Sequence, residues 1–182
     1  MRYISLLRGI NVSGQKKIIM KDLKALYENI GFTNVVTYIQ SGNVIFDSDG
    51  SYDDVIVKIQ SAITKQYGFD VPVQVREVKH FESIIKACPF SELDLVAEGT
   101  RVMVTFLADV PSDVYIDKLM EYVKEPERLV VLGRREVYLH CPNGYGKTKL
   151  NNCFLENKLQ VKATTRNWKS VLKLWELSTS TS

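Results

Sequence analysis

Short apolar runs alternate with amphipathic segments along this chain. Four runs in the first half are rich in Val, Ile, Leu and Tyr, which indicates β-strands. They comprise residues 2–8, 35–39, 44–47 and 71–75. Apolar residues spaced three or four apart predict one helix over residues 21–30 and another that opens at 51–54 and stops at Gly68. The first half is therefore predicted to run strand, helix, strand, strand, helix, strand.

Local signals mark the ends of these elements. Gly31 and Gly68 supply left-handed stops for the two helices. Ser51 and Asp54 resemble a capping box that opens the second helix. Because Pro72 cannot donate a hydrogen bond to a central ladder, the fourth strand is predicted to lie at a sheet edge.

The same order of elements is predicted again after a short helix at 80–87 and an acidic stretch at 92–98. The elements of this second set are strands at 101–107, 129–132, 136–140 and 160–164, a helix opening at Pro111-Ser112 and a helix at 147–157. A closing helix follows, with Thr165 as its N-cap and a buried stripe that includes Trp168 and Trp175.

Two such sets in tandem predict an α+β protein made of two ferredoxin-like subdomains with antiparallel sheets and a C-terminal helix. The boundaries that we expect are 1–79 for the first subdomain, 80–99 for a helical and acidic linker, 100–164 for the second subdomain, 165–177 for the closing helix and 178–182 for a frayed tail.

This topology predicts two candidate sites. In the first subdomain, strand one ends where the hairpin of strands two and three begins. That places five polar side chains at a common end of the sheet, and we expect them to form a candidate ligand site: Arg8, Asn11, Gln40, Ser41 and Asn43. Asn and Ser also satisfy turn backbone readily, so a purely structural role for them stays open.

In the second subdomain, strands three and four are predicted to end at the same edge of the sheet. Each is followed by a segment that opens a helix, and helix N-termini attract anions. The candidate anion-binding residues there are Asn143, Gly144, Gly146, Lys147, Thr148, Lys149, Arg166 and Asn167. A glycine-rich turn with a solvated lysine is the alternative interpretation of this loop.

Composition is that of an ordinary globular protein, with 45% hydrophobic and 25% charged residues in 182. The net charge of +3 is uneven: +2 over 1–50, −4 over 51–140 and +5 over 141–182. A basic end is a weak pointer to an anionic partner. We expect no leader or membrane anchor, and three cysteines without CxxC spacing indicate reduced thiols and a cytoplasmic location.

Three segments carry a resemblance to a known family. Residues 8–12 (Arg-Gly-Ile-Asn-Val), 38–46 (Tyr-Ile-Gln-Ser-Gly-Asn-Val-Ile-Phe) and 165–168 (Thr-Arg-Asn-Trp) resemble the bacterial domain-of-unknown-function family 1697, over a stretch that reaches about residue 174. The resemblance implies a duplication of two ferredoxin-like subdomains, and it implies no activity or catalytic residues. The chain has Thr148 where the family pattern leads us to expect serine.

The sequence lacks the motifs of several well-known kinds of functional site. A P-loop needs a glycine where Cys141 stands, and Ser41 lacks the flanking glycines of a nucleophile elbow. His140, Cys141 and Cys153 match no zinc spacing, and no RNA-recognition pattern of basic, glycine and aromatic residues occurs in the strands. We expect no metal and no cofactor.

Two functional hypotheses remain. One is a binding module for an anionic partner, either nucleic acid or a phosphorylated small molecule. The other is an enzyme that acts on a small polar substrate at the Arg8–Asn43 end of the first sheet. The absence of an obvious acid–base pair makes the enzyme the weaker hypothesis, and the sequence does not indicate an oligomeric state.

Overall fold

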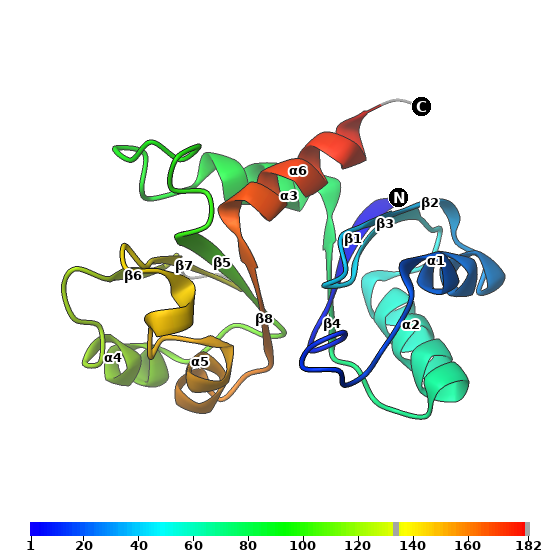
Figure 1. Cartoon of the computed structure of the whole chain (residues 1–182), viewed down its shortest axis with the longest axis horizontal. Coiled ribbons are helices and arrows are strands. Elements are labelled where there is room, and N and C mark those ends of the chain that lie inside the picture. Colours follow the sequence, from blue (N-terminus) through cyan, green and yellow to red (C-terminus); the bar gives the residue numbers. More distant parts are fainter. Residues whose placement is uncertain (133–134, 181–182) are drawn as a thin grey trace. The chain divides into compact units, whose positions relative to one another are not determined.

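The computed structural model describes residues 1–132 and 135–180, which form an α+β protein with six α-helices and two four-stranded antiparallel sheets (Figure 1). The chain divides into two compact units. Unit 1 comprises Met1–Glu82 and Leu174–Ser182, and unit 2 comprises Ser83–Lys173. The divisions fall within two helices, α3 (Val78–Lys86) and α6 (Trp168–Thr179). The predicted α+β class with antiparallel sheets is confirmed.

Unit 1 contains the sheet in strand order β2-β3-β1-β4. Its elements are β1 (Arg2–Leu7), α1 (Met20–Asn29), β2 (Thr33–Tyr38), β3 (Asn43–Asp47), α2 (Tyr52–Tyr67) and β4 (Val73–Glu77). Every neighbouring pair is antiparallel, so β1 and β2 run parallel to each other on either side of β3. The strand that Pro72 precedes lies at an edge, as its lack of an N–H predicts.

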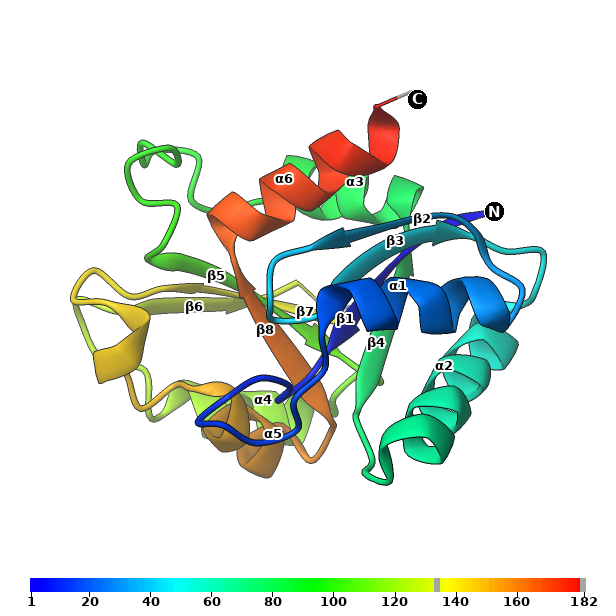
Figure 2. The same cartoon turned by 45° about the vertical axis from the view of Figure 1, so that its right-hand side comes forward.

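The predicted helix signals of unit 1 are present in the structure. Ser51 is the N-cap of α2, and its side chain accepts a hydrogen bond from the Asp54 backbone. Gly68 ends α2 with φ 74°, and Gly31 follows α1 with φ 96°. These stops turn the chain back toward the sheet, so that α1 and α2 cover the same face of it (Figure 2).

The core of unit 1 lies between that face and the two helices. The aromatic ring of Phe46 is at its centre, within 6 Å of the rings of Tyr3, Tyr27 and Phe32. The hydroxyl of Tyr27 contacts the Ser5 hydroxyl at 2.8 Å, so its one polar atom is paired inside the core. Residues of β1 that point to the opposite face, such as Ile4, are fully buried too. Neither face of β1 is therefore open for stacking of bases.

Unit 2 repeats the order of elements. They are β5 (Val102–Leu107), α4 (Asp113–Met120), β6 (Arg128–Val131), β7 (Glu136–His140), the one-turn helix η1 (Tyr145–Lys147), α5 (Asn152–Leu159) and β8 (Ala163–Asn167), with strand order β6-β7-β5-β8. Helices α4 and α5 lie side by side over one face of this sheet (Figure 1). Gly133 and Arg134, between the strands predicted at 129–132 and 136–140, lie outside the described residues.

Two predicted helix starts in unit 2 are wrong. The helix expected at 147–157 begins at Asn152, because Asn151 is its N-cap and accepts a hydrogen bond from the Phe154 backbone. The closing helix begins at Trp168, since β8 pairs with β5 as far as Asn167. Thr165 is a strand residue and not an N-cap.

Helix α6 extends into the stretch of residues that was expected to fray. Ser178 and Thr179 belong to α6, and Ser178 is buried. Arg2 donates from Nε to the Ser178 carbonyl at 2.8 Å, which fixes a helix end that a run of Ser and Thr predicts to fray. Thr181 and Ser182 lie outside the described residues. Within the part of the chain that is described, no helix combines the length and the hydropathy needed to cross a bilayer.

Candidate functional site

The end of β1 in unit 1 brings the two predicted segments together. The Leu7 backbone donates to the Gly42 carbonyl at 2.9 Å, and the Arg8 backbone donates to the Pro72 carbonyl at 3.0 Å. The loop after β1 therefore begins between the starts of β3 and β4. This is the convergence that the strand topology predicts.

Asn11 joins the loop to the β2–β3 turn. Its Nδ2 donates to the Gln40 carbonyl at 2.8 Å and to the Ile18 carbonyl at 2.9 Å, and its Oδ1 accepts from the Ile18 backbone. The side chain is thus engaged with backbone on both sides, as Asn commonly is in turns. It closes the loop of residues 11–18 and holds it against the turn.

Left-handed backbone is concentrated in these two segments. Within residues 9–16 and 39–42, the residues with positive φ are Gly9, Asn11, Ser13, Gly14, Lys16, Ile39 and Gly42. Ile39, with φ 51°, is the least expected of them because a β-branched residue is strained in this region. Such strain persists only where surrounding contacts fix the backbone, and it is often found at binding sites.

Asn43 and Ser41 stabilise the turn from inside. Asn43 is fully buried, and its Nδ2 donates to the Tyr38 carbonyl at 2.9 Å and to the Ser41 Oγ at 3.0 Å. These contacts agree with the alternative role of both residues, which is to satisfy the hydrogen bonds of the turn. The Asn43 side chain is inaccessible to a ligand, whereas the Ser41 side chain is half-buried.

A hollow of about 290 Å³ lies beside Asn11 and Gln40. Its lining is completed by the exposed Lys17 and by Gly14, Ile18 and Ile19. Lys17 is the one titratable side chain in this lining, and no acidic residue is among the residues described there. The half-buried Arg8 and the buried Asn43 lie at the same end of the sheet but outside the lining.

The Lys147 loop in unit 2 differs from the predicted anion site. Lys147 and Thr148 line a hollow of about 390 Å³ together with Asn143 and Gly144, and its lining also includes Lys124, Glu125 and Glu127. The loop amides of Gly144, Lys147, Thr148 and Leu150 already donate within the loop. The two carboxylates offset the charge of the two lysines, and the engaged amides cannot also donate to an anion.

Arg166 and Asn167 do not join Lys147 and Lys149 in one constellation. Thr165 contacts Asn152 and Thr105 on the face that α5 covers, so the next side chain, Arg166, points to the opposite face. Burial there lowers the pKa of the Arg166 guanidinium to about 10, which leaves it charged at neutral pH. Asn167 is the N-cap of α6, since its Oδ1 accepts from the Ser170 backbone at 2.8 Å.

Comparison with known proteins identifies the family. The sequence profile described as "Protein of unknown function (DUF1697)" matches residues 1–138 of the 182. The chain belongs to this family. The matched stretch includes the hollow beside Asn11 and ends before the Lys147 loop and the Thr165–Trp168 segment.

Among solved structures, a conserved bacterial protein from Streptococcus pneumoniae has a similar fold. It aligns with a TM-score of 0.78 at 24% identity, over 97% of this chain and 98% of the other. At that identity the likeness concerns the fold alone. A search of curated proteins found no significant match.

Two of the three cysteines of this DUF1697 protein, Cys88 and Cys141, have a raised thiol pKa because they are removed from solvent. Burial raises the pKa of the Cys141 thiol to about 12, and the neighbouring Glu127 carboxylate contributes to this rise. Cys88 is half-buried and Cys153 is exposed. Across the described residues, no group of three or more His, Cys, Asp and Glu side chains is placed to hold a metal ion.

We expect Cys153 to react with iodoacetamide much faster than Cys141 in the native protein, because the thiolate is the nucleophile and Cys141 is both protonated and buried. Mass spectrometry of the peptides over a time course measures this. Cys153→Ser should remove the fast phase, and unfolding in urea should make all three thiols react alike. Fast native labelling of Cys141 would contradict the assignment.

One charged cluster in unit 2 was missed by the sequence reasoning. Glu98 Oε2 lies 3.1 Å from His140 Nε2 and Glu98 Oε1 lies 3.3 Å from Arg101, while Glu92 pairs with Arg128. The hydrogen bond from His140 lowers the pKa of Glu98. The acidic stretch predicted as a linker is therefore attached to the sheet. Glu98 and His140 are 42 residues apart, so their contact leaves no local signal in the sequence.

Proposed function

We propose that this protein binds a small phosphorylated molecule at the hollow lined by Asn11, Lys17 and Gln40. The observation that carries the proposal is a lysine in a concave lining whose described residues include no carboxylate. Lysine is a point charge with three donors and suits a phosphate group. The Gly14 backbone and the aliphatic side chains of Ile18 and Ile19 provide the rest of the contact surface.

The size of the hollow favours a small ligand over nucleic acid. At about 290 Å³ it lies at the lower limit of small-molecule pockets. A nucleic-acid interface extends over a much larger basic surface and tracks several phosphates. Nucleic acid remains an outcome that the experiment below distinguishes.

The same hollow supports an enzyme less well. Lys17 supplies a charge, but the described lining of the hollow contains no second titratable side chain to complete an acid–base pair. The Asn11 side chain is already used in closing the loop, because it donates to the Gln40 backbone carbonyl. The alternative of an enzyme acting on a small polar substrate therefore rests on the location alone.

We also infer that each unit is a ferredoxin-like subdomain and that the two arose by duplication. In support, the orders β2-β3-β1-β4 and β6-β7-β5-β8 correspond strand for strand, and each unit places two helices on one sheet face. The three cysteines form no disulfide, which supports a cytosolic location.

Titration of the ¹⁵N-labelled protein with inorganic phosphate at low salt tests the proposed ligand. We expect saturable shifts of the amides of Gly14, Lys17 and Ile18. Lys17→Gln should weaken the fitted affinity about three- to tenfold, because one charge-assisted contact is lost. Lys147→Gln is the matched control and should leave the affinity unchanged.

Two results would overturn the proposal: shifts confined to residues 143–148, or no shift at low salt. A parallel titration with a single-stranded oligonucleotide separates the partner classes. Binding of the oligonucleotide that is stronger than that of phosphate, and that falls steeply with salt, would favour nucleic acid.

A further inference from the structure

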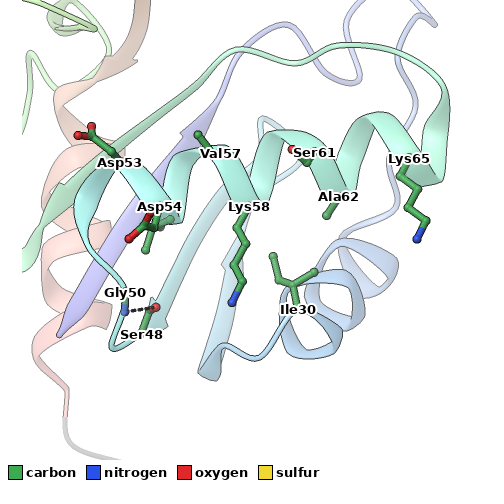
Figure 3. Close-up of a pocket in the computed structure, with 11 residues that line it drawn as sticks. Ile30, Ser48, Gly50, Asp53, Asp54, Val57, Lys58, Ser61, Ala62 and Lys65 are labelled. Atoms are coloured by element: carbon green, nitrogen blue, oxygen red, sulfur yellow. Dashed lines mark hydrogen bonds between the residues drawn. The ribbon is translucent and has the colours of Figure 1, made fainter.

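A groove of about 800 Å³ runs along the exposed side of α2 in unit 1 (Figure 3). Val55, Val57, Ala62 and Ile30 provide its apolar surface. Asp53 and Asp54 lie at one end of the helix, Lys65 lies toward the other, and Lys58 lies between them (Figure 3). Val57 is among the residues that line the groove, and it is 61% exposed. An aliphatic side chain placed in this way is available to a partner.

The order of residues along α2 is self-complementary. Asp53, Val57, Ser61 and Lys65 are spaced four apart and form one ridge about 18 Å long. The ridge has an acid at its start, a base at its end and small uncharged residues between them. A second copy of the same ridge, turned to run antiparallel, meets it with acid facing base at both ends.

The helix dipole alone does not account for this surface. It favours acids in the first turn and bases in the last, as α2 has with Asp53, Asp54 and Lys65. It gives no reason for an exposed valine between them or for a groove beside the ridge. Two antiparallel copies of α2 would cover that valine. The positive end of each helix dipole would also lie beside the negative end of the other, which is favourable.

We propose that the groove is the interface of a weak homodimer in which the α2 helices of two copies pair antiparallel. The two-fold axis passes between Val57 and Ser61, so that Asp53 of one copy faces Lys65 of the other and each Val57 lies beside the second copy's Ser61. Ser61 and Ala62 are small and permit close approach of the helices. The partner α2 takes the place of solvent in the groove.

The interface is small, so the dimer is expected to depend on concentration. Stable dimers bury about 800 Å² on each partner, and a single pair of helices buries less. The charge pairs are exposed and contribute mainly to the choice of partner and direction. We therefore expect dissociation in the micromolar range or above.

Sedimentation velocity over a concentration series, with charge reversal at both ends of the ridge, tests the dimer. The wild-type chain should show reversible dimerisation. Asp53→Lys and Lys65→Asp each replace two attractive contacts with two repulsive ones, so each should weaken the dimer roughly tenfold or more. An equimolar mixture of the two variants should dimerise again, because at both ends of the ridge a lysine of one variant then faces an aspartate of the other.

Val57→Asp and Lys118→Asp complete the design. Val57 is exposed, so an aspartate there should abolish the dimer without changing the thermal unfolding of the monomer. Lys118 lies on α4, outside the groove, and its reversal should have no effect. A wild-type chain that stays monomeric up to millimolar concentration overturns the proposal. So does a dimer that none of the α2 variants weakens, because its interface would lie elsewhere.

Discussion

Replacing Gly42 with alanine should lower the free energy of unfolding by about 2–4 kcal/mol. Gly42 has φ +83°, and an added Cβ would lie 2.6 Å from Ile10 Cδ1 and 2.8 Å from Leu7 Cβ. Both neighbours are buried in the core of unit 1, so neither has open space into which to move. Urea denaturation followed by circular dichroism measures the change, with an unchanged m-value indicating that the unfolded state is the same.

Gly68→Ala provides the matched control for this substitution. Gly68 has nearly the same backbone conformation, φ +74°, but nothing lies within 4 Å of the position that an added Cβ would take. Its replacement should cost only the left-handed strain, about 1–2 kcal/mol. Equal losses for the two variants would show that the contact of Gly42 with Leu7 and Ile10 has no energetic weight.

The elements with local signals could be predicted from the sequence. Gly31, Gly68 and Ser51 end or begin helices through their own backbone preferences and side-chain bonds, so the first half of the chain was predicted almost element by element. The end of β8 could not be read in this way. Thr165 resembles an N-cap, and pairing of β8 with β5 as far as Asn167 overrides that local preference.

The candidate sites show the same division between local and long-range causes. The strand topology was sufficient to predict that Asn11 lies beside the Gln40 turn. In the observed strand order, β1 and β2 end at the same end of the sheet. The chemistry of the Lys147 loop was not accessible, since Glu125 and Glu127 reach it only through tertiary folding. The groove along α2 was not predicted. Val57 lies on the exposed, polar side of the helix, and a single aliphatic residue on a surface is too common to indicate a binding site.

Asn43→Asp should lower the free energy of unfolding by about 3–5 kcal/mol at neutral pH. The aspartate has nearly the shape of Asn43, but it replaces the Nδ2 donor with a second oxygen that faces the Tyr38 carbonyl at 2.9 Å. Asn43 is fully buried, so the new charge would lack solvent as well as a donor on that side. Denaturation in urea at several pH values measures the loss.

The pH dependence of this variant separates a charge effect from a loss of shape. Burial beside a carbonyl favours the protonated carboxyl group, so the pKa of the new aspartate should be higher in the folded state than in the unfolded one. The folded protein then binds more protons, and stability falls as the pH rises above about 4 and recovers as the pH is lowered. Asn43→Ala removes the same hydrogen bond without adding a charge and should show no such recovery relative to wild type. If the aspartate variant is as stable as wild type at neutral pH, the Asn43 amide does not hold the turn that positions Gln40 beside Asn11.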